Sequence, residues 1–219
     1  MKQLTTKRLV LRPMTDEALA AAIAAETDPH MQKALSEMLA GCRAHPEARL
    51  FSTNWEILEK NGGPVGSLGF HGPAVNGAVE IGYGVDAAYE GKGYATEAAT
   101  ALMAWAYAQK DVYWIQAEAE PNNAASQRVL EKLGFQPTGE IGEEGPRYEK
   151  EKPPSAWCTT GMMLGMSIGI AYGTSRDELA TWMSIGMGLG LAVGTAADSA
   201  DAKKRATLRR ARENGEKRD

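Results

Sequence analysis

The sequence predicts an α/β (α+β) protein built on a mixed sheet, followed by a glycine-rich helical hairpin. Three observations support this prediction. Residues 1 to about 150 alternate between strand and helix patterns after a start made of strands. Residues 157–197 are rich in glycine and methionine and almost free of charge, and residues 202–219 form a basic tail. A chain of 219 residues, 43% of them hydrophobic, is long enough to bury the core of one such domain.

Apolar periodicity places the elements of the first part. Leu9 and Leu11 alternate within a strand at 8–12, and an Ala-rich helical stretch at 16–40 is interrupted near Asp28-Pro29. Further strands are predicted at 49–58, 64–70, 79–86 and 112–118, helices at 94–109 and 123–133, and one or two strands at 136–150. Gly134 follows the last of these helices where a left-handed residue commonly ends a helix. The Pro pair within 149–155 indicates a boundary.

Charge and cysteine content exclude several classes of protein. The net charge is −4, and because the tail carries +5 (8 − 3), the remainder carries −9. This balance argues against a nucleic-acid-binding protein. Cys42 and Cys158 lie far apart and form no CxxC pair, so we expect neither a disulfide scaffold nor a metal site. The first residues contain no apolar core of signal-peptide length, so we expect a reducing, cytoplasmic environment.

The sharpest local feature is the run YEGKGYATE at 89–97, which connects a predicted strand to a predicted helix. Gly91 and Gly93 permit a tight turn and the close approach of a ligand. The unpaired N–H groups at the start of the following helix would point at an anion, and the helix dipole favours negative charge there. The turn is therefore a candidate cradle for a pyrophosphate.

The runs EIGYGVDAAYEGKGYATEA and AEAEPNNAASQRVLEKLGF resemble the GNAT superfamily of acyl-CoA-dependent N-acyltransferases. The opening TKRLVLRPMT is similar to the first strand of the branch that includes the ribosomal-protein N-acetyltransferases, and the resemblance covers residues 5 to about 150. It implies a curved sheet that splays between the strands at 79–86 and 112–118, with acetyl-CoA held in the cleft. We therefore expect a GNAT-like acetyltransferase domain at 1–152, a helical hairpin at 153–201 and a basic tail at 202–219.

The resemblance also implies a set of residues that bind acetyl-CoA. Its cofactor loop corresponds to Glu90, Gly91, Lys92, Gly93, Tyr94, Ala95 and Thr96, with backbone amides on the pyrophosphate. The family usually has Gln or Arg where this chain has Glu90, whose carboxylate repels phosphate unless it points away; Lys92 is a candidate to offset that repulsion. Asn123 and Ser126 match the family's Asn-x-x-Ser, which contacts the pantetheine arm and the sulfur of CoA. Asn123 is equally suited to cap the helix that follows.

Acetyl transfer to an amine needs a base for the amine proton, a donor to the thioester oxygen and an acid for the thiolate. Glu80 is the candidate base because strand alternation places it on one face with Gly82 and Gly84, which leave space for a substrate. His71 is a second candidate base. The backbone N–H of Val85 is the candidate donor to the carbonyl oxygen.

The candidate acid for the thiolate is Tyr148, and Ser126, which the resemblance places near the sulfur of CoA, is a further catalytic candidate. The structural alternative for Glu80 is a solvated surface carboxylate, and that for Tyr148 is a tyrosine of the core. Glu118 and Glu120 are candidates to attract a cationic amine.

Glycines recur at every fourth position in two apolar runs: Gly161, Gly165, Gly169 and Gly173, then Gly186, Gly190 and Gly194. Glycine costs a helix about 1 kcal/mol per position relative to alanine, so this repetition needs a compensating close contact between helices. The pattern predicts a hairpin of helices at 157–172 and 179–197 that resembles glycine-zipper hairpins. Because each apolar run is about 16 residues against the ~20 that span a bilayer, the sequence favours a soluble homo-oligomer over a membrane segment.

Together these features predict an enzyme that moves an acetyl group from acetyl-CoA to a primary amine by direct attack in a ternary complex. The acceptor, either a small molecule or a protein N-terminus, stays open. The alternative is a catalytically degenerate GNAT domain that serves as the scaffold of a glycine-zipper oligomer or a membrane-associated assembly. Glu90 is the feature that points toward this alternative.

Overall fold

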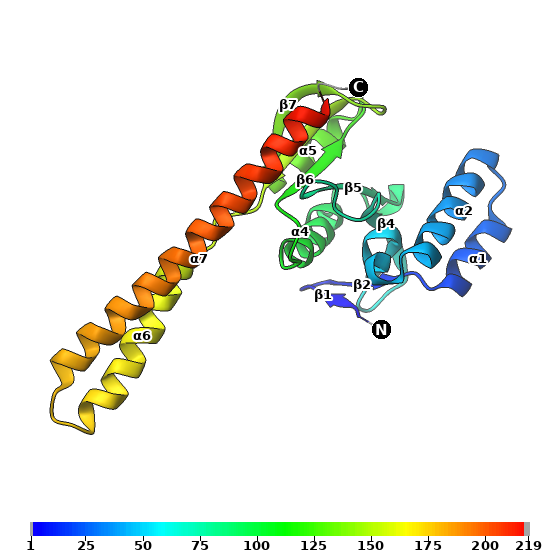
Figure 1. Cartoon of the computed structure of the whole chain (residues 1–219). Coiled ribbons are helices and arrows are strands. Elements are labelled where there is room, and N and C mark those ends of the chain that lie inside the picture. The colour runs from blue at the N-terminus through cyan, green and yellow to red at the C-terminus, as the bar shows by residue number, and fades with distance from the viewer. Residues whose placement is uncertain (1, 217–219) are drawn as a thin grey trace. The chain divides into compact units, whose positions relative to one another are not determined.

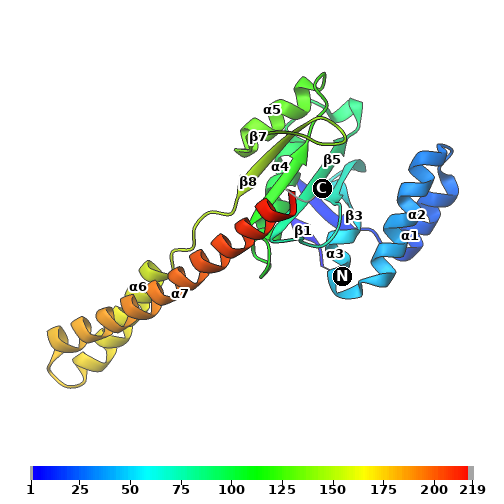
Figure 2. The same ribbon diagram turned by 45° about the horizontal axis from the view of Figure 1, so that its top comes forward.

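The structure is a computed structural model that describes residues 2–216, with side chains to residue 214. Contacts divide the chain into two compact units, Met1–Lys152 and Pro153–Asp219. Figures 1 and 2 show the elements of each unit from two directions. The strands are β1 (Leu4–Thr5), β2 (Leu9–Pro13), β3 (Asn54–Glu59), β4 (Pro64–Phe70), β5 (Ala78–Val85), β6 (Trp114–Glu118), β7 (Gln136–Ile141) and β8 (Pro146–Glu151). The helices are α1 (Asp16–Ala25), α2 (Pro29–Ala44), α3 (Arg49–Ser52), α4 (Tyr94–Tyr107), α5 (Ala124–Leu133), α6 (Trp157–Thr174) and α7 (Leu179–Glu216).

The first unit is a mixed sheet flanked by helices, which confirms the predicted fold class. Its strand order is β1-β2-β3-β4-β5-β6-β8-β7, and β5 with β6 is the parallel pair among the described strands. Strands β1 to β5 form an antiparallel meander, as an opening made of strands predicts. Helix α4 packs across β1, β2, β4 and β5 (Figure 2). The sheet and α4 together enclose the core.

Local sequence explains most of these elements. Leu9 and Leu11 are both fully buried, so the alternation predicted for the first strand is confirmed. Asp28 caps α2 with Pro29 at its first turn, which explains the interruption between α1 and α2. Gly134 ends α5 with φ of 79°, the left-handed conformation expected for a residue at that position.

The prediction of one strand over 49–58 is wrong at its start. Residues Arg49–Ser52 form the short helix α3, and β3 begins at Asn54. Tertiary contacts hold this turn: the guanidinium of Arg49 donates to Asp16 and to the Met14 carbonyl, and the indole of Trp55 donates to the Leu50 carbonyl. These bonds outweigh the extended preference of the local sequence.

The second unit is a pair of antiparallel helices. Helices α6 and α7 run side by side, joined by a turn at 175–178 (Figure 1). A Cβ on Gly165 would overlap the carbonyl oxygen of Gly186, and one on Gly190 would overlap that of Gly161. The two glycine stripes therefore face each other, as predicted. Helix α7 is longer than predicted, because it continues past Ala197 to Glu216 and takes in the basic segment that the structure describes.

Candidate active site

The sheet opens at the centre of the first unit. Strands β5 and β6 pair over three positions, ending with Glu80 opposite Gln116. Beyond Glu80, β5 stays paired with β4 as far as Val85 but has no partner on its other side among the described residues. The end of this parallel ladder creates the splay that the resemblance implies, with Glu80 at its apex.

A tight turn connects β5 to α4 at the open end of the splay. Gly91 and Gly93 both adopt left-handed conformations, with φ of 71° and 78°, which glycine reaches without a steric cost. Gly93 occupies the N-cap position of α4 and offers no side chain to the first turn. Since the first N–H groups of a helix lack intrahelical acceptors, those at the start of α4 can receive an anion.

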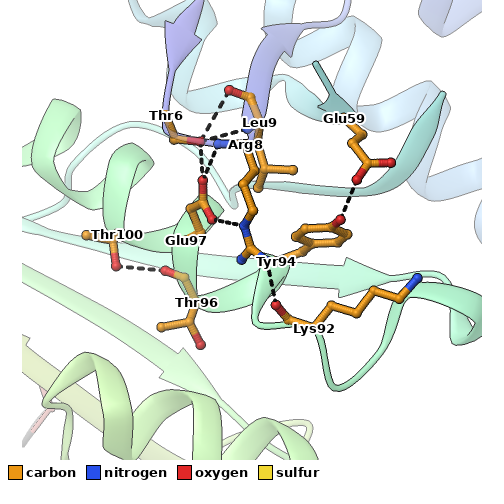
Figure 3. Close-up of polar contacts among 9 residues, drawn as sticks. All are labelled: Thr6, Arg8, Leu9, Glu59, Lys92, Tyr94, Thr96, Glu97 and Thr100. Atoms are coloured by element: carbon orange, nitrogen blue, oxygen red, sulfur yellow. Dashed lines mark hydrogen bonds and ion pairs between the residues drawn. The ribbon is translucent and has the colours of Figure 1, made fainter. Parts of the chain in front are cut away.

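The connection between β1 and β2 holds this turn in place (Figure 3). Glu97, in the first turn of α4, accepts hydrogen bonds from the Thr6 hydroxyl and from the backbone N–H and Nε of Arg8, at 2.6–2.8 Å. The same guanidinium donates to the carbonyl oxygen of Lys92 at 3.0 Å and lies 4.6 Å from the ring centre of Tyr94. On the other side of the ring, the Tyr94 hydroxyl donates to Glu59. The turn is therefore fixed before any ligand arrives.

A cleft of about 450 Å³ lies between the end of β5, this turn and the first half of α5. It brings together nine of the ten residues predicted to bind acetyl-CoA, which come from three separate segments. They are Val85, Glu90, Gly91, Gly93, Tyr94, Ala95, Thr96, Asn123 and Ser126.

Lys92 is the tenth, and its side chain points elsewhere. Its ammonium lies 4.7 Å from the ring centre of Tyr89, and the residue does not line the cleft. Two other cations, Arg128 and Lys132 of α5, do line the cleft that Glu90 also borders. Among these three cations, the positive charge that borders the cleft therefore comes from α5 and not from Lys92.

Asn123 and Ser126 form part of one hydrogen-bonded chain at the start of α5. The Asn123 side-chain oxygen accepts the Ser126 backbone N–H at 2.9 Å, which makes Asn123 the helix cap. The Ser126 hydroxyl lies 3.0 Å from the hydroxyl of Tyr83 on β5. Burial raises the pKa of Tyr83, although its bond to Ser126 acts in the opposite direction. Two hydroxyl groups therefore face the cleft in their protonated form at neutral pH.

The two candidate bases, His71 and Glu80, form a pair on the other face of β5, and neither lines the cleft. The Nδ1 atom of His71 lies 3.2 Å from a carboxylate oxygen of Glu80, and the two residues are also joined by a backbone hydrogen bond of 3.0 Å. This bond to Glu80 raises the pKa of His71, and burial opposes it only in part. The Nε2 atom is turned toward Gly82, where a Cβ would lie only 3.1 Å away. Gly84, two residues along the same face, borders the cleft.

Tyr148, the candidate acid, and Glu118, a candidate to attract the amine, do not line the cleft. Tyr148, on β8, is half-buried against the hydrophobic core and is not among the residues that line the cleft. The Glu118 carboxylate is 4% exposed and binds the Arg147 guanidinium and the Glu144 backbone N–H. Burial alone would raise the pKa of Glu118, but these bonds lower it. Its charge is neutralised within the protein.

The sequence analysis missed several residues of the cleft, among them Tyr83, Tyr89, Arg128, Val129 and Lys132. A signal for three of them was present. Arg128, Val129 and Lys132 follow Ala125 at intervals of three, four and seven residues, so they share one face of α5. Once Asn123 and Ser126 were assigned to the cleft, that spacing could have extended the prediction.

Comparison with known proteins gives one domain match. A family model described as "Acetyltransferase (GNAT) domain" matches residues 8–136. The uncharacterized N-acetyltransferase YjdG of Bacillus subtilis is 44% identical over 84 residues, which are 37% of this chain and 50% of YjdG. The chain thus spans half the length of that curated relative.

Solved structures share the fold of the first unit. An acetyltransferase from Agrobacterium tumefaciens is 25% identical with a TM-score of 0.53, over 69% of this chain and 95% of that one. RimL, a ribosomal L7/L12 α-N-protein acetyltransferase solved in complex with coenzyme A, is 18% identical with a TM-score of 0.54. That match covers 68% of this chain and 98% of RimL, and it concerns the fold alone.

Proposed function

Because the chain belongs to the GNAT acetyltransferase family, we propose that it transfers an acetyl group from acetyl-CoA to a primary amine. One observation carries the proposal. The β5–β6 ladder ends beside a cleft that joins the open first turn of α4 to the hydroxyls of Ser126 and Tyr83. Such a cleft offers backbone N–H groups and the cations of α5 to a pyrophosphate, with two proton donors further in.

The reaction forms a C–N bond and breaks the C–S bond of the thioester, so a proton must leave the amine and one must reach the thiolate. We assign the first transfer to the His71–Glu80 pair. Glu80 accepts Nδ1–H of His71 and so leaves Nε2, above the bare surface of Gly82, as the proton acceptor. Glu80 is then a positioning residue as well as the anion that strengthens the base.

The second proton transfer falls to the hydroxyls that face the cleft. Tyr83 and Ser126 lie 3.0 Å apart there, whereas Tyr148 packs against the core. The backbone N–H of Val85, at the unpaired end of β5, is the donor proposed for the carbonyl oxygen. We therefore assign the acid to the Tyr83–Ser126 pair and not to Tyr148. A turnover measurement tests this assignment, because Tyr83→Phe should slow the reaction more than Tyr148→Phe.

The test of the function itself is binding and turnover with the full chain in mild detergent. Calorimetry should detect acetyl-CoA binding, and a thiol-release assay over polyamine, aminoglycoside and peptide N-terminal amines should find at least one acceptor. Arg128→Ala should weaken acetyl-CoA binding, while Arg12→Ala, outside the cleft, should not. A failure to bind acetyl-CoA at millimolar concentration would exclude the enzyme and favour a scaffold.

The base assignment has its own measurement. We expect both His71→Gln and Glu80→Gln to reduce turnover by about a hundredfold, with acetyl-CoA affinity unchanged. In the wild type, kcat/KM should fall as the pH drops through the raised pKa of His71, because protonated His71 cannot act as a base. In Glu80→Gln the carboxylate that raises the pKa of His71 is gone, so the residual kcat/KM should fall at a lower pH than in the wild type. If His71→Gln keeps activity within about threefold of wild type, Glu80 acts without it.

A further inference from the structure

The outward surface of the α6–α7 hairpin is apolar along both helices. The glycine stripes are turned inward, with Gly169, Gly173 and Gly194 buried, while the larger side chains point out. Leu164 and Ile168 are each 61% exposed and Val193 is 70% exposed. Soluble monomers rarely leave so continuous an apolar surface uncovered, so this one requires a partner.

Charge is confined to the two ends of the hairpin. The sequence has no Asp, Glu, Lys or Arg from 157 to 175 or from 179 to 197. Charged residues occur at the turn, Arg176-Asp177-Glu178, and at the open end from Asp198 onward. The uncharged stretches contain 18 residues in α6 and 19 in α7, or about 27 and 28 Å at 1.5 Å per residue. These lengths are close to the ~30 Å hydrocarbon layer of a bilayer.

The aromatic residues of the hairpin, like its charged residues, lie near its two ends. Trp157 lies at the open end, Tyr172 and Trp182 lie near the turn, and the stretches 158–171 and 183–200 contain no aromatic residue. Trp157 and Tyr172 are exposed, and the rings of Tyr172 and Trp182 are in contact at 4.5 Å. Tryptophan and tyrosine gather at the two interfaces of membrane-spanning segments, which is the distribution found in this hairpin.

Five hydroxyl side chains between these ends donate to a backbone carbonyl oxygen four residues earlier. Thr160, Ser167 and Thr174 each donate to the carbonyl four residues earlier in α6, at 2.9–3.1 Å. Ser184 and Thr195 do the same in α7, at 2.8–2.9 Å. A polar group in hydrocarbon must find its partner inside the protein, and these groups need no water.

The open end continues into a basic helix. Residues 203–212 of α7 contain six Lys or Arg residues: Lys203, Lys204, Arg205, Arg209, Arg210 and Arg212. Positive charge beside a membrane segment favours the cytoplasmic face and its anionic lipids. By length and composition α7 is the one described helix that qualifies as a candidate membrane span; α6 does not qualify by itself, and its bare stripe matches α7 as a packing partner.

We propose that the α6–α7 hairpin inserts into a lipid bilayer, with its turn at the far interface. The segment that enters at Pro153 and the basic helix that leaves at Asp198 then lie on the cytoplasmic side. Lipid thus takes the place of the soluble homo-oligomer that the sequence alone favoured. The proposal stands independently of the acetyltransferase activity.

The test is flotation of the full chain with vesicles of phosphatidylethanolamine and phosphatidylglycerol, followed by a sodium carbonate wash that removes surface-bound proteins. The wild type should float and stay bound. Ile168→Arg, at the middle of α6, should reduce the bound fraction by about tenfold or more, because arginine is most costly at the centre of a span. Ser175→Arg introduces the same side chain at the turn and should change it by less than about twofold.

Acetyl-CoA binding and helix content, measured on each variant in detergent, verify that the protein is folded. Two results overturn the proposal. One is a wild-type chain that remains in the detergent-free supernatant as a defined oligomer by light scattering, because copies of the chain then cover the apolar surface. The other is a chain that carbonate removes from vesicles, because it then lies on the membrane and does not span it.

Discussion

The two units of this chain bury opposite parts of their sequence. In the first unit, large side chains such as Trp55, Trp114 and Ile57 are fully buried. In the second, glycines are the buried residues and the large apolar side chains are outside. Both units are rich in apolar residues, so hydrophobicity alone does not decide which residues go inside. The difference lies in what makes contact, because side chains fill the first core while two backbones meet in the second.

This difference predicts opposite responses to a change in side-chain size. A core of interlocking side chains loses stability when a side chain is shortened, since a cavity remains. A backbone contact loses stability when a side chain is added, since the helices must separate. Two sets of substitutions test this contrast, and a third tests the polar contacts of the first unit.

The largest effect is expected from Leu102→Ala in α4. Leu102 is fully buried in the core, so its truncation should cost the first unit about 2–5 kcal/mol of unfolding free energy. Leu164→Ala in α6 is the matched control, because Leu164 is 61% exposed and its loss should change stability by no more than about 0.5 kcal/mol. Urea unfolding of the full chain in detergent measures both. Equal losses would remove the contrast between the units.

A second, smaller effect is expected from adding side chains to the hairpin. Gly165→Leu introduces atoms where the Gly186 carbonyl lies, and overpacking of this kind costs about 1–3 kcal/mol. Gly188→Leu is the control, because Gly188 faces open space; replacing a helical glycine there should stabilise α7 by up to about 1 kcal/mol. Hydrogen exchange of α6 and α7, measured by mass spectrometry, should become faster in Gly165→Leu and slower in Gly188→Leu. Acetyl-CoA affinity should be unchanged in both variants.

The smallest effect concerns the carboxylate that ties the N-terminal strands to α4. Glu97→Gln weakens the bonds from Thr6 and Arg8, which should cost about 0.5–1.5 kcal/mol and weaken acetyl-CoA binding through the Lys92 carbonyl. Glu56→Gln is the control, because its ion pair with Arg12 is exposed and worth no more than about 1 kcal/mol. An unchanged urea midpoint for Glu97→Gln would show that these bonds do not stabilise the turn.

The same carboxylate gives this prediction a pH dependence. Burial would raise the pKa of Glu97, but its bonds to Thr6 and Arg8 outweigh burial and lower it below the ordinary 4.5. A lowered pKa stabilises the folded protein above pH 4.5, and that contribution is lost as the pH falls through the folded value. The urea midpoint of the wild type should therefore decline below pH 4.5 more steeply than that of Glu97→Gln. Parallel curves would assign the acid sensitivity to other carboxylates.

Sequence reasoning reached the fold through local rules that the structure keeps. The alternation of Leu9 and Leu11, the cap at Asp28 and the left-handed Gly134 each act over a few residues. The short helix α3 was missed because its cause is distant: Arg49 binds Asp16, 33 positions away. Local preference could not reveal that bond.

The candidate site also has a part that neighbouring residues determine and a part that depends on contacts between distant segments. The turn at 90–96 could be predicted because the residues that form it are contiguous and two are glycines. The pairing of His71 with Glu80 depends on the register between the end of β4 and β5, and that of Tyr83 with Ser126 depends on where α5 packs. Neither register nor packing can be read from spacing. The position of the Lys92 ammonium, 4.7 Å from the ring centre of Tyr89, also depends on side-chain packing.

The order of synthesis has a consequence for α6. Its four glycines each cost a helix about 1 kcal/mol relative to alanine, and the stripe of α7 that compensates for them is made later. Asp198, whose carboxylate accepts the backbone N–H groups of Trp157 and Cys158, leaves the ribosome 40 residues after Cys158. Until then, α6 lacks both its packing surface and the cap of its first turn. We therefore expect the hairpin to form in a single late step, after the first unit has been translated in full.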